Sequence, residues 1–492
     1  IHSEGPILIK AASSFTDMEG AQKNLDTEIP HWDFDRTRQE LNSIWEQRLS
    51  QVTVQTNNRN DKEKFYGALY LPRTFNDVDG RYPSFSTGHP FRQSANGRNY
   101  YEDYSMWDTY RALHPLVNIL TPKKAGDMMQ SLVDKYEQGG WLPIFPCWNS
   151  YTAAMIGDHC ISALGDAYIK GIRNFDINKA CEGMLRNAFR TPATYEEYKN
   201  GMGRRALNSY LKYGYIPLED SVPEAFHTCE QVSRTLEYAY DDFVLAQVLQ
   251  KLETSDDYFP DPQKAGLYDT LMIRARYYRN VINPSTGYAQ GRYAEGAPCH
   301  YTWYAPHDIY GLMECMGGKE KYIAKLDSMF SEHRYWHGNE PCHQIAYLFN
   351  YAGQPWKTQR EVRHIMETEY LNAPGGLSGN DDAGQMSAWY VFSAMGFYPV
   401  CPGTPYYIIG SPSFPRMSIR LENGKTFTIL AHNANKKNIY IQSAKLNGKE
   451  YDKNYFTHQD IIQGGTLEFQ MGPNPNTNWG ASALSLPPDN MK

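Results

Sequence analysis

Several features that mark common protein classes are missing from this chain of 492 residues. No apolar run approaches the length of about 18 residues that a membrane-spanning helix needs, so we expect no membrane span. Neither sign of charge dominates: the net charge of -7 argues against a nucleic acid or an anionic membrane as partner. The eight cysteines are scattered and none forms CxxC, which disfavours a zinc or redox motif and leaves disulfides open.

Aromatic residues, in contrast, are abundant at 14% of the chain, with 38 Tyr and 10 Trp. Aromatic rings cover the apolar faces of sugars, and a Tyr hydroxyl can bond to sugar hydroxyls. A Tyr-rich core and surface would give the same composition, so this observation alone leaves both interpretations open. The chain has no initiating Met and its first ten residues resemble the middle of a strand, so we expect it to begin inside a longer precursor.

Helical periodicity dominates the chain up to about residue 400. Apolar residues recur with helical spacing from Leu41 to Leu49, and similar patterns cover 105–120, 150–172, 228–252, 264–280, 301–316 and 359–370. Loops rich in Gly and Pro lie between them, at 71–98, 138–150, 284–300 and 372–384. Loops of this kind are where a functional site would sit. A helical domain of this size could be a barrel of helix pairs with one open end for a pocket.

The pattern changes after Pro402. Short runs at 426–429, 438–442 and 466–470 alternate apolar and polar residues, and Asn423-Gly424 and Asn447-Gly448 are strong hairpin signals. We therefore predict a small antiparallel β-unit after a mainly helical domain.

The first segment that could carry chemistry is 375–393, where a glycine-rich stretch runs into Asp381 and Asp382 and then into a helix. Asp at a helix start accepts backbone N–H bonds, and a cap of this kind explains one Asp well and two poorly. The second segment contains Glu295, followed by aromatics at 301, 303 and 304. A carboxyl among aromatic rings has a raised pKa, which suits a general acid; the alternative is a Glu in the first turn of a helix that begins near Pro298.

The third segment, 335–343, gathers His337, Asn339, Glu340 and His343. Amide and carboxylate oxygens are hard ligands that suit calcium better than zinc, and the spacing is not HExxH. A polar turn that caps the helix from Cys342 onward explains these residues equally well.

The fourth segment, 104–114, places Trp107, Asp108 and Arg111 within one helical turn. Trp107 could stack on a sugar whose hydroxyls Asp108 binds, or Asp108 and Arg111 could simply pair on the helix. An internal salt-bridge network is the favoured interpretation of a further polar strip, Arg234, Glu237, Asp241 and Asp242. Two carboxyl groups far apart in sequence, Glu295 and Asp382, fit glycoside hydrolysis, with one as acid and the other as base.

At this point the motifs resemble glycoside hydrolase family 92, the calcium-dependent exo-α-mannosidases. The resemblance covers almost the whole chain, through SFTDMEGAQKNLDTEIPHWDFD, FNDVDGRY, MWDTYRALHPL, VSRTLEYAYDDF, HGNEPCHQIAYLFNYAGQPWKTQ and GLSGNDDAGQMSAWYVFSAMGFYPVCPG. It implies an (α/α)6-barrel catalytic domain that works with an N-terminal β-sandwich, most of which this chain lacks. The expected domains are the end of that sandwich or a linker at 1–14, the barrel at 15–402 and a β-rich domain at 403–492.

The resemblance also implies single-step hydrolysis of terminal α-linked mannose with inversion, in the periplasm or outside the cell. Glu295 matches the general acid, and Asp382, together with Asp381, matches the general base. An inverting site needs room for water, so we expect the Glu295 and Asp382 carboxyls to lie about 6.5–9.5 Å apart.

For the remaining site residues, the resemblance places Asn339 and Glu340 at a calcium ion that touches neighbouring hydroxyls of mannose. Trp107, Asp108 and His337 would bind the terminal sugar of a mannose-containing glycan. The chain reads EGAPCHYTW where family members commonly read EGNAWQYTW, which bears on linkage specificity more than on reaction type. The alternatives are another (α/α)6-barrel glycosidase, such as a glucosidase, and a catalytically degenerate glycan-binding relative.

Overall fold

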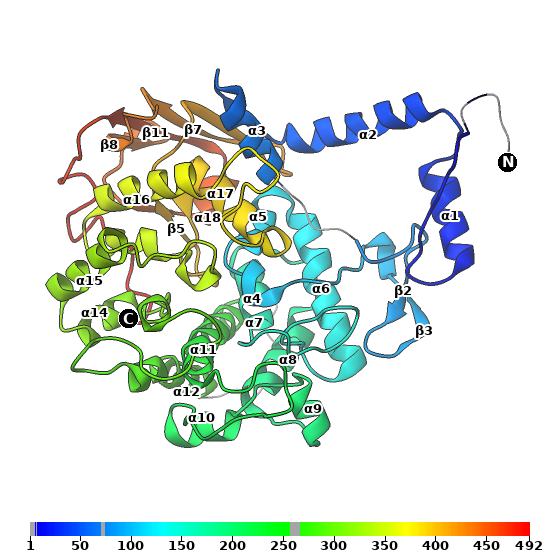
Figure 1. Ribbon diagram of the computed structural model, residues 1–492, viewed down its shortest axis with the longest axis horizontal. Helices are drawn as coiled ribbons and strands as arrows, with labels where there is room; N and C mark the ends of the chain where they lie inside the picture. Colours follow the sequence, from blue (N-terminus) through cyan, green and yellow to red (C-terminus); the bar gives the residue numbers. More distant parts are fainter. Residues whose placement is uncertain (1–4, 6, 70–73, 256–265) are drawn as a thin grey trace.

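A computed structural model of the protein describes residue 5 and residues 7–69, 74–255 and 266–492. Most helices gather in one body, and a β-sheet containing β7, β8 and β11 covers one end of it (Figure 1). The two helices α1 and α2 and the hairpin of β2 and β3 project from this body on the side of the N-terminus (Figure 1). The predicted mainly helical fold with a C-terminal β-unit is therefore confirmed.

The α-helices are α1 (Met18–Glu28), α2 (Phe34–Leu49), α3 (Arg59–Ala68), α4 (Met106–Thr109), α5 (Leu113–Leu120), α6 (Pro122–Gly139), α7 (Cys160–Ile169), α8 (Ile177–Phe189), α9 (Tyr195–Lys199), α10 (Leu207–Tyr213), α11 (Gln231–Glu253), α12 (Leu267–Arg274), α13 (Pro298–Tyr301), α14 (Ile309–Cys315), α15 (Lys319–Ser331), α16 (Pro355–Thr368), α17 (Gln385–Met395) and α18 (His458–Ile462). Short 3-10 turns are η1 (Ala95–Gly97), η3 (Tyr277–Val281), η4 (Glu340–Cys342), η5 (Ile345–Asn350) and η6 (Asp382–Gly384).

The helix predicted over 105–120 is in fact two helices, α4 and α5. Pro115 has no N–H to donate to the carbonyl of Arg111, and its ring would clash with that carbonyl, which disfavours one continuous helix here. The helices predicted over 228–252 and 359–370 match α11 and α16 closely. That predicted over 150–172 is α7 only, because Gly157 upstream has the left-handed φ of 78°.

The other predicted helices are also shorter than expected. Helix α14 covers only the end of 301–316, because Pro306 interrupts the pattern. Helix α12 covers part of 264–280, whose first two residues lie outside the described residues. The described residues among 1–14 form no strand, although the first residues were expected to be the last strand of a sandwich.

The strands are β1 (Val52–Gln55), β2 (Arg81–Ser84), β3 (Gly88–Gln93), β4 (Phe397–Tyr398), β5 (Tyr406–Ile409), β6 (Arg416–Arg420), β7 (Thr426–His432), β8 (Tyr440–Leu446), β9 (Lys449–Glu450), β10 (Tyr455–Thr457) and β11 (Gly465–Gly472). The largest sheet has the order β1-β6-β7-β11-β8-β9. Its pairs are antiparallel, as predicted, with the exception of β11 and β7, which run parallel.

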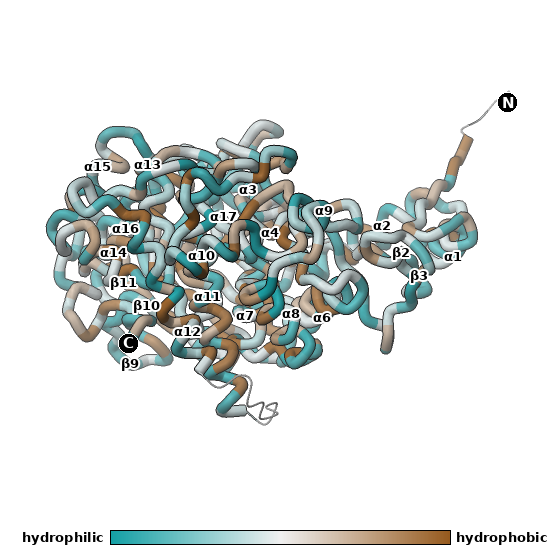
Figure 2. The backbone as a smooth tube through the Cα atoms, turned by 90° about the horizontal axis from the view of Figure 1, so that it is seen from below, coloured by the Kyte–Doolittle hydropathy of each residue, from teal (hydrophilic) through white to brown (hydrophobic). Residues whose placement is uncertain are grey.

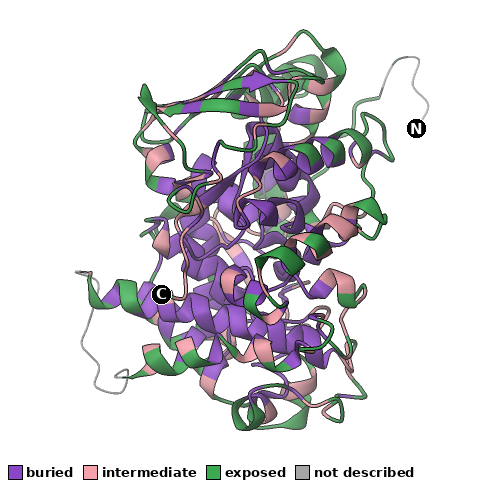
Figure 3. Ribbon diagram, turned by 90° about the vertical axis from the view of Figure 1, so that its left-hand side faces the viewer, coloured by how far each residue is buried: buried purple, intermediate pink, exposed green. Residues whose placement is uncertain are grey.

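Both Asn-Gly turns lie where the hairpin signals predicted them, between β6 and β7 and between β8 and β9. The sheet also includes β1, far upstream in the chain, where Val52 is opposite Ile419. Helix α16 is attached to it, because Gln359 accepts a hydrogen bond of 3.0 Å from the backbone N–H of Ile441. One continuous apolar core therefore runs from the helices into the sheet (Figure 3).

All eight cysteines are free thiols. Within the described residues, no helix combines the length and the apolar character that crossing a bilayer would require.

The longest helix, α11, lies inside the helical body and buries charged side chains among apolar ones. Asp242 accepts hydrogen bonds from Arg204 at 2.7 Å and from two nitrogens of Arg274 at 2.7 and 2.8 Å. The Tyr210 hydroxyl donates a further one at 3.0 Å. The predicted internal salt-bridge network is confirmed, and Arg234 forms a separate buried pair with Glu230 at the helix start.

Replacing Asp242 by Ala should lower the free energy of unfolding by about 3–5 kcal/mol, because the buried Arg274 loses its carboxylate partner and Arg204 keeps only Asp158. Urea denaturation followed by tryptophan fluorescence measures the change. The matched control is Glu40→Ala, which breaks the exposed pair of Arg36 and Glu40 and should leave the denaturation midpoint unchanged. Equal midpoints for both variants would contradict this account of the network.

Candidate active site

The two adjacent aspartates at the start of α17 have different surroundings. Asp381 Oδ1 accepts a hydrogen bond of 3.0 Å from the backbone N–H of Ser387, so Asp381 caps the helix. Asp382 has a left-handed φ of 47°, and the next residue, Ala383, has 54°. Such backbone costs about 1–3 kcal/mol per non-glycine residue and persists at sites where the surrounding structure enforces it. Because of this strained turn, Asp382 does not share the position of Asp381 at the start of α17.

A close contact of two glycines joins this turn to the segment that carries Glu340. A Cβ atom on Gly379 would lie 2.7 Å from Cα of Gly338, and a Cβ on Gly338 would lie 2.7 Å from the carbonyl oxygen of Ser378. Only glycine allows the two backbones to approach so closely. The Gly residues in both sequence segments thus explain how the two loops meet.

Three carboxylates from distant segments converge at this contact. One oxygen each of Asp108 on α4, Glu340 on η4 and Asp382 on η6 lie within 4.8 Å of one another. The first two side chains are buried, at 5% and 2% exposure. Glu340 Oε1 is buried without a hydrogen-bond partner among the described residues. We call Asp108, Glu340 and Asp382 the carboxylate triad.

Burial and mutual repulsion both disfavour the charged forms of the triad. Burial, followed by the charges of Asp108 and Asp382, raises the pKa of Glu340 to about 10. Burial and then the charge of Asp382 also hold the pKa of Asp108 well above its usual range. A bound cation would reverse both effects, and carboxylate oxygens are the ligands that hard divalent cations prefer. The unpartnered oxygen of Glu340 and this donor set therefore fit a metal ion.

Glu295 lies on the loop before α13 and is exposed, in contrast to the triad. Asn339 Nδ2 donates a hydrogen bond to Glu295 Oε2, while Asn339 Oδ1 is buried without a partner among the described residues. Burial raises the pKa of Glu295 above its ordinary value, with a contribution from the charge of Asp382, although the Asn339 bond opposes the shift. The arrangement suits a carboxyl group that keeps a proton for donation.

Trp107 is the residue before Asp108, and its ring is buried at 1% exposure. Its Nε1 donates to Glu237 Oε1 at 3.0 Å, and the guanidinium carbon of Arg111 lies 5.0 Å from its ring centroid. The buried ring does not support the predicted stacking on a sugar. Asp108, predicted to bind substrate hydroxyls, is a member of the triad, and its contact with substrate stays a prediction.

His337, also predicted to bind substrate, is buried with both ring nitrogens in use. Nδ1 lies 2.7 Å from the Tyr335 hydroxyl and Nε2 lies 2.7 Å from the Tyr370 hydroxyl. Burial holds its pKa well below the ordinary value, so the ring is neutral. The geometry favours a structural role that orders the segment before Asn339.

His159 was not singled out from the sequence, yet it links the site to the α11 network. Its Nε2 lies 3.4 Å from Glu237 Oε2, and its Nδ1 lies 2.9 Å from Asp241 Oδ1. Burial alone would lower the pKa of His159, but Asp241 and Glu237 raise it to about 9. No periodic signal reveals this residue, because its partners lie about 80 positions away in the sequence.

A helical domain that places a carboxylate triad near a separate, exposed carboxyl group has the acid and base groups of a glycoside hydrolase. In a comparison with known protein families, the glycosyl hydrolase family 92 catalytic domain matches residues 20–473. The chain therefore belongs to glycosyl hydrolase family 92.

Two solved structures and one curated relative illustrate the likeness. A family GH92 α-mannosidase from Bacteroides thetaiotaomicron is 36% identical, with a TM-score of 0.85 over 96% of this chain and 63% of its own. A family GH92 inverting mannosidase from the same bacterium is 33% identical, with a TM-score of 0.87 over 97% of this chain and 68% of its own. An uncharacterized secreted glycosidase of Arthroderma benhamiae is 28% identical, and the match covers 99% of this chain and 63% of that protein. The chain thus spans a little under two thirds of the first and third of these proteins.

The stability of the protein should fall as the pH rises from 6.5 to about 9, because the folded state holds the His159 proton more tightly than the unfolded chain. The contribution is complete below pH 6.5 and is lost as the pH passes through the folded-state pKa of about 9. In His159→Gln, urea midpoints should be lower at pH 6.5 and should depend less on pH across this range. His432→Gln, which alters a histidine beside Glu468 at the surface, should keep the wild-type slope. An unchanged slope in His159→Gln would show that this proton is not the cause.

Proposed function

We propose that the chain is the catalytic region of an exo-acting α-mannosidase that removes terminal α-linked mannose from glycans with inversion of configuration. The observation that carries the proposal is the carboxylate triad beside Glu295, found in a member of family 92. A solved relative that is described as an inverting mannosidase supports both the sugar and the stereochemistry. The catalytic domain would form an (α/α)6-barrel, in keeping with the helical body and the TM-scores.

Glu295 acts as the general acid in this proposal. Its proton passes to the glycosidic oxygen as the bond from that oxygen to the anomeric carbon breaks. The raised pKa of Glu295 supports this role, because the group stays protonated at higher pH than an ordinary Glu. Asn339 positions the carboxyl through its hydrogen bond to Oε2.

Asp382 acts as the general base that takes a proton from water while the water oxygen bonds to the anomeric carbon. The strained turn at Asp382 and Ala383 supports this role, because strain of this kind is typical of functional positions. Asp381, predicted alongside it as catalytic, would position the turn by capping α17. The separation of about 6.5–9.5 Å between the carboxyls of Glu295 and Asp382 that inversion needs stays a prediction.

Calcium is the proposed cofactor. Glu340 and Asn339 each have a buried oxygen without a partner among the described residues, and Asp108 adds a further hard oxygen donor beside them. When bound, calcium would supply positive charge that neutralises the triad and anchors neighbouring sugar hydroxyls. The protein residues then hold the sugar between the acid and the base.

An N-terminal β-sandwich is the proposed partner domain, and α1 and α2 offer it a surface. None of the residues of α2 is buried, and the apolar side chains there and just before it are exposed, including Trp32 at 60% and Phe34 at 67%. Figure 2 shows that apolar residues also lie along the start of the projecting arm, beside the N-terminus. An extracellular or periplasmic location is proposed from the secreted relative.

The decisive test is hydrolysis of a panel of α-linked mannobioses, with the product anomer followed by NMR. We expect β-mannose as the first product. Glu295→Gln should lower kcat on mannobiose by about 10²–10⁴-fold and spare dinitrophenyl α-mannoside, whose leaving group needs little acid help. Asp382→Asn should lower kcat by a similar factor on both substrates, because a base is needed whatever the leaving group.

The matched control is Glu332→Gln, which changes an exposed carboxylate a few residues before Asn339 in the chain and outside the triad. α-Mannose as the first product would rule out inversion. Binding of mannose without turnover by the wild-type protein would favour a degenerate glycan-binding relative instead.

Calcium should raise the midpoint of thermal unfolding of EDTA-treated protein, because a ligand that binds the folded state alone stabilises it by about 2.7 kcal/mol at a concentration of 100 times Kd. Differential scanning calorimetry measures the shift. Asp108→Asn and Glu340→Gln should each abolish most of it, whereas Glu314→Gln, at an exposed carboxylate on α14, should retain it. An undiminished shift in both triad variants would place the ion elsewhere.

A further inference from the structure

Gln385, the first residue of α17, is fully buried and lies three positions after Asp382. Its side chain forms hydrogen bonds to both of the other segments that supply the carboxylate triad. A single amide group thus connects three parts of the protein that lie far apart in the sequence.

The amide oxygen of Gln385 binds the segment that carries Asp108. Oε1 accepts hydrogen bonds from the backbone N–H of Ala112 at 2.9 Å and from that of Leu113 at 3.3 Å. These N–H groups lie at the start of α5, where no side chain of the segment itself caps the helix. The first N–H groups of a helix have no partner within the helix. Gln385 therefore caps α5 from a distant part of the chain and holds the junction of α4 and α5, four residues after Asp108.

The amide nitrogen of Gln385 binds the segment that carries Glu340. Nε2 lies 3.0 Å from Nδ1 of His343, which is three residues after Glu340. Because the amide oxygen accepts the two bonds from α5, the nitrogen is the donor and Nδ1 of His343 is the acceptor. The proton of His343 is then on Nε2, which lies 3.1 Å from the carbonyl oxygen of His337. Burial lowers the pKa of His343 to about 3, so the ring is neutral, as this arrangement requires.

A second residue of α17 strengthens the contact with this segment. Trp389 lies one helical turn after Gln385, so the two side chains project from the same face of the helix. Its Nε1 donates a hydrogen bond of 2.8 Å to the carbonyl oxygen of His343. Both the ring and the backbone of His343 are thus bound to α17.

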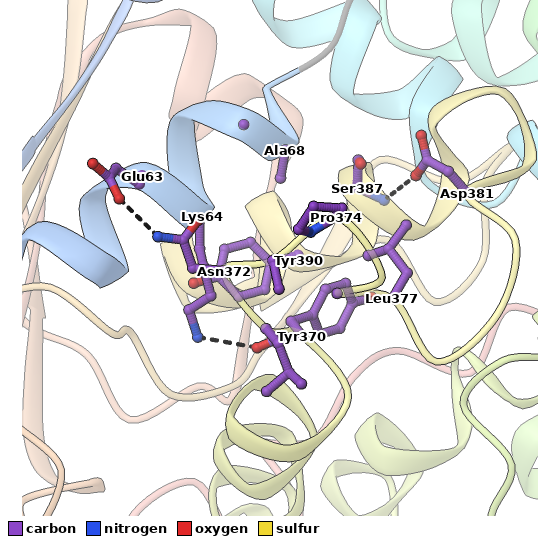
Figure 4. A pocket seen from close by; sticks show the side chains of 14 residues that line it. Glu63, Lys64, Ala68, Tyr370, Asn372, Pro374, Leu377, Asp381, Ser387 and Tyr390 are labelled. Atoms are coloured by element: carbon purple, nitrogen blue, oxygen red, sulfur yellow. Dashed lines mark hydrogen bonds between the residues drawn. The ribbon is translucent and has the colours of Figure 1, made fainter.

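The strained turn around Asp382 is held at both ends. Residues 382–384 all have left-handed φ angles, of 47°, 54° and 103°. Before them, Asp381 Oδ1 accepts the backbone N–H of Ser387 at 3.0 Å (Figure 4). After them, Gln385 is fixed by its three hydrogen bonds. A displacement of Gln385 would therefore also displace Asp382.

We infer that Gln385 is a positioning residue of the active site, which sets the distances among the three carboxylates of the triad by tying their segments together. The inference rests on the proposed function, in which the triad holds calcium and Asp382 is the base. In this role Gln385 contacts neither substrate nor ion and acts through the positions of the triad residues. Replacing a residue that orients metal ligands typically changes metal affinity or activity by about 10–100-fold.

Three variants separate this role from a general contribution to stability. Gln385→Met keeps the length of the side chain and removes all three hydrogen bonds. His343→Phe keeps an aromatic ring and removes the bond to Nε2 of Gln385, while both bonds to Oε1 remain. The matched control is Gln359→Met, because Gln359 is also a buried glutamine on a helix and accepts a backbone N–H, that of Ile441 in the β-sheet, at 3.0 Å.

Hydrogen exchange followed by mass spectrometry measures the coupling of the segments and needs neither activity nor metal. In Gln385→Met, peptides that cover 108–115 and 337–345 should both exchange on the order of tenfold faster than in the wild type, because both segments lose a bond to α17. In His343→Phe, faster exchange should be confined to 337–345. In Gln359→Met, both of these segments should keep wild-type protection.

Wild-type exchange at 108–115 in Gln385→Met would overturn the inference. If Gln385→Met does not fold, His343→Phe decides the question: faster exchange at 337–345 supports the inference, and wild-type exchange there rejects it.

Titration of EDTA-treated protein with calcium chloride in a calorimeter tests the consequence for the site. The Kd for calcium should rise about 10–100-fold in Gln385→Met and should stay within about twofold of the wild type in Gln359→Met. Urea midpoints are measured for both variants, so that calcium affinities are compared at known stability. Equal Kd values for Gln385→Met and the wild type would contradict the positioning role.

If the wild-type protein binds no calcium, the proposed cofactor is wrong, and hydrogen exchange alone decides the role of Gln385. Joint loss of protection at 108–115 and 337–345 in Gln385→Met would then support the inference, and loss in only one of these segments would reject it.

Discussion

Mutual repulsion among three carboxylates is the constraint on which the rest of the structure depends. Asp108, Glu340 and Asp382 have oxygens within 4.8 Å of one another, and two of these side chains are buried. Two negative charges about 4 Å apart repel by about 4 kcal/mol at an effective dielectric constant of about 20. Without a cation, the raised pKa values of Glu340 and Asp108 relieve this repulsion through protonation, and packing holds the segments together. The close contact of Gly338 with Gly379 supplies part of that packing.

The charged groups of α11 contact α4, the segment that carries Asp108. Glu237 accepts the indole N–H of Trp107, the residue before Asp108, and His159 bridges Glu237 to Asp241. Each buried charge in this network lies beside an opposite one, as Asp242 does between two guanidinium groups. The hydrogen bond from Trp107 to Glu237 connects α4 to this network. Pairs of opposite charge thus support the site from α11. The three groups of the carboxylate triad are, in contrast, all acidic, and together they fit a cation.

Local sequence patterns predicted the elements better than they predicted side-chain roles. The Asn-Gly turns predicted two hairpins correctly, and the apolar periodicity predicted α11. Both signals depend only on residues that are neighbours in the sequence. Asp381 and Asp382 look equivalent in sequence, yet one caps α17 and the other joins the triad, since only the second has a left-handed backbone. His337 looked available for substrate, but Tyr335 and Tyr370 occupy both of its nitrogens, and the second of these lies 33 positions away.

The sequence by itself determined the helical body, the C-terminal β-unit and the family, and it predicted Glu295, Glu340 and Asp382 as site residues. These features follow from local periodicity, turn chemistry and motifs in a fixed order. Only the tertiary structure decided that Asp108 joins Glu340 and Asp382 and that Asn339 bonds to Glu295. The physical reason is that the charges, hydrogen bonds and burial of a site act over a few ångströms in space, between residues that folding brings together from distant parts of the chain.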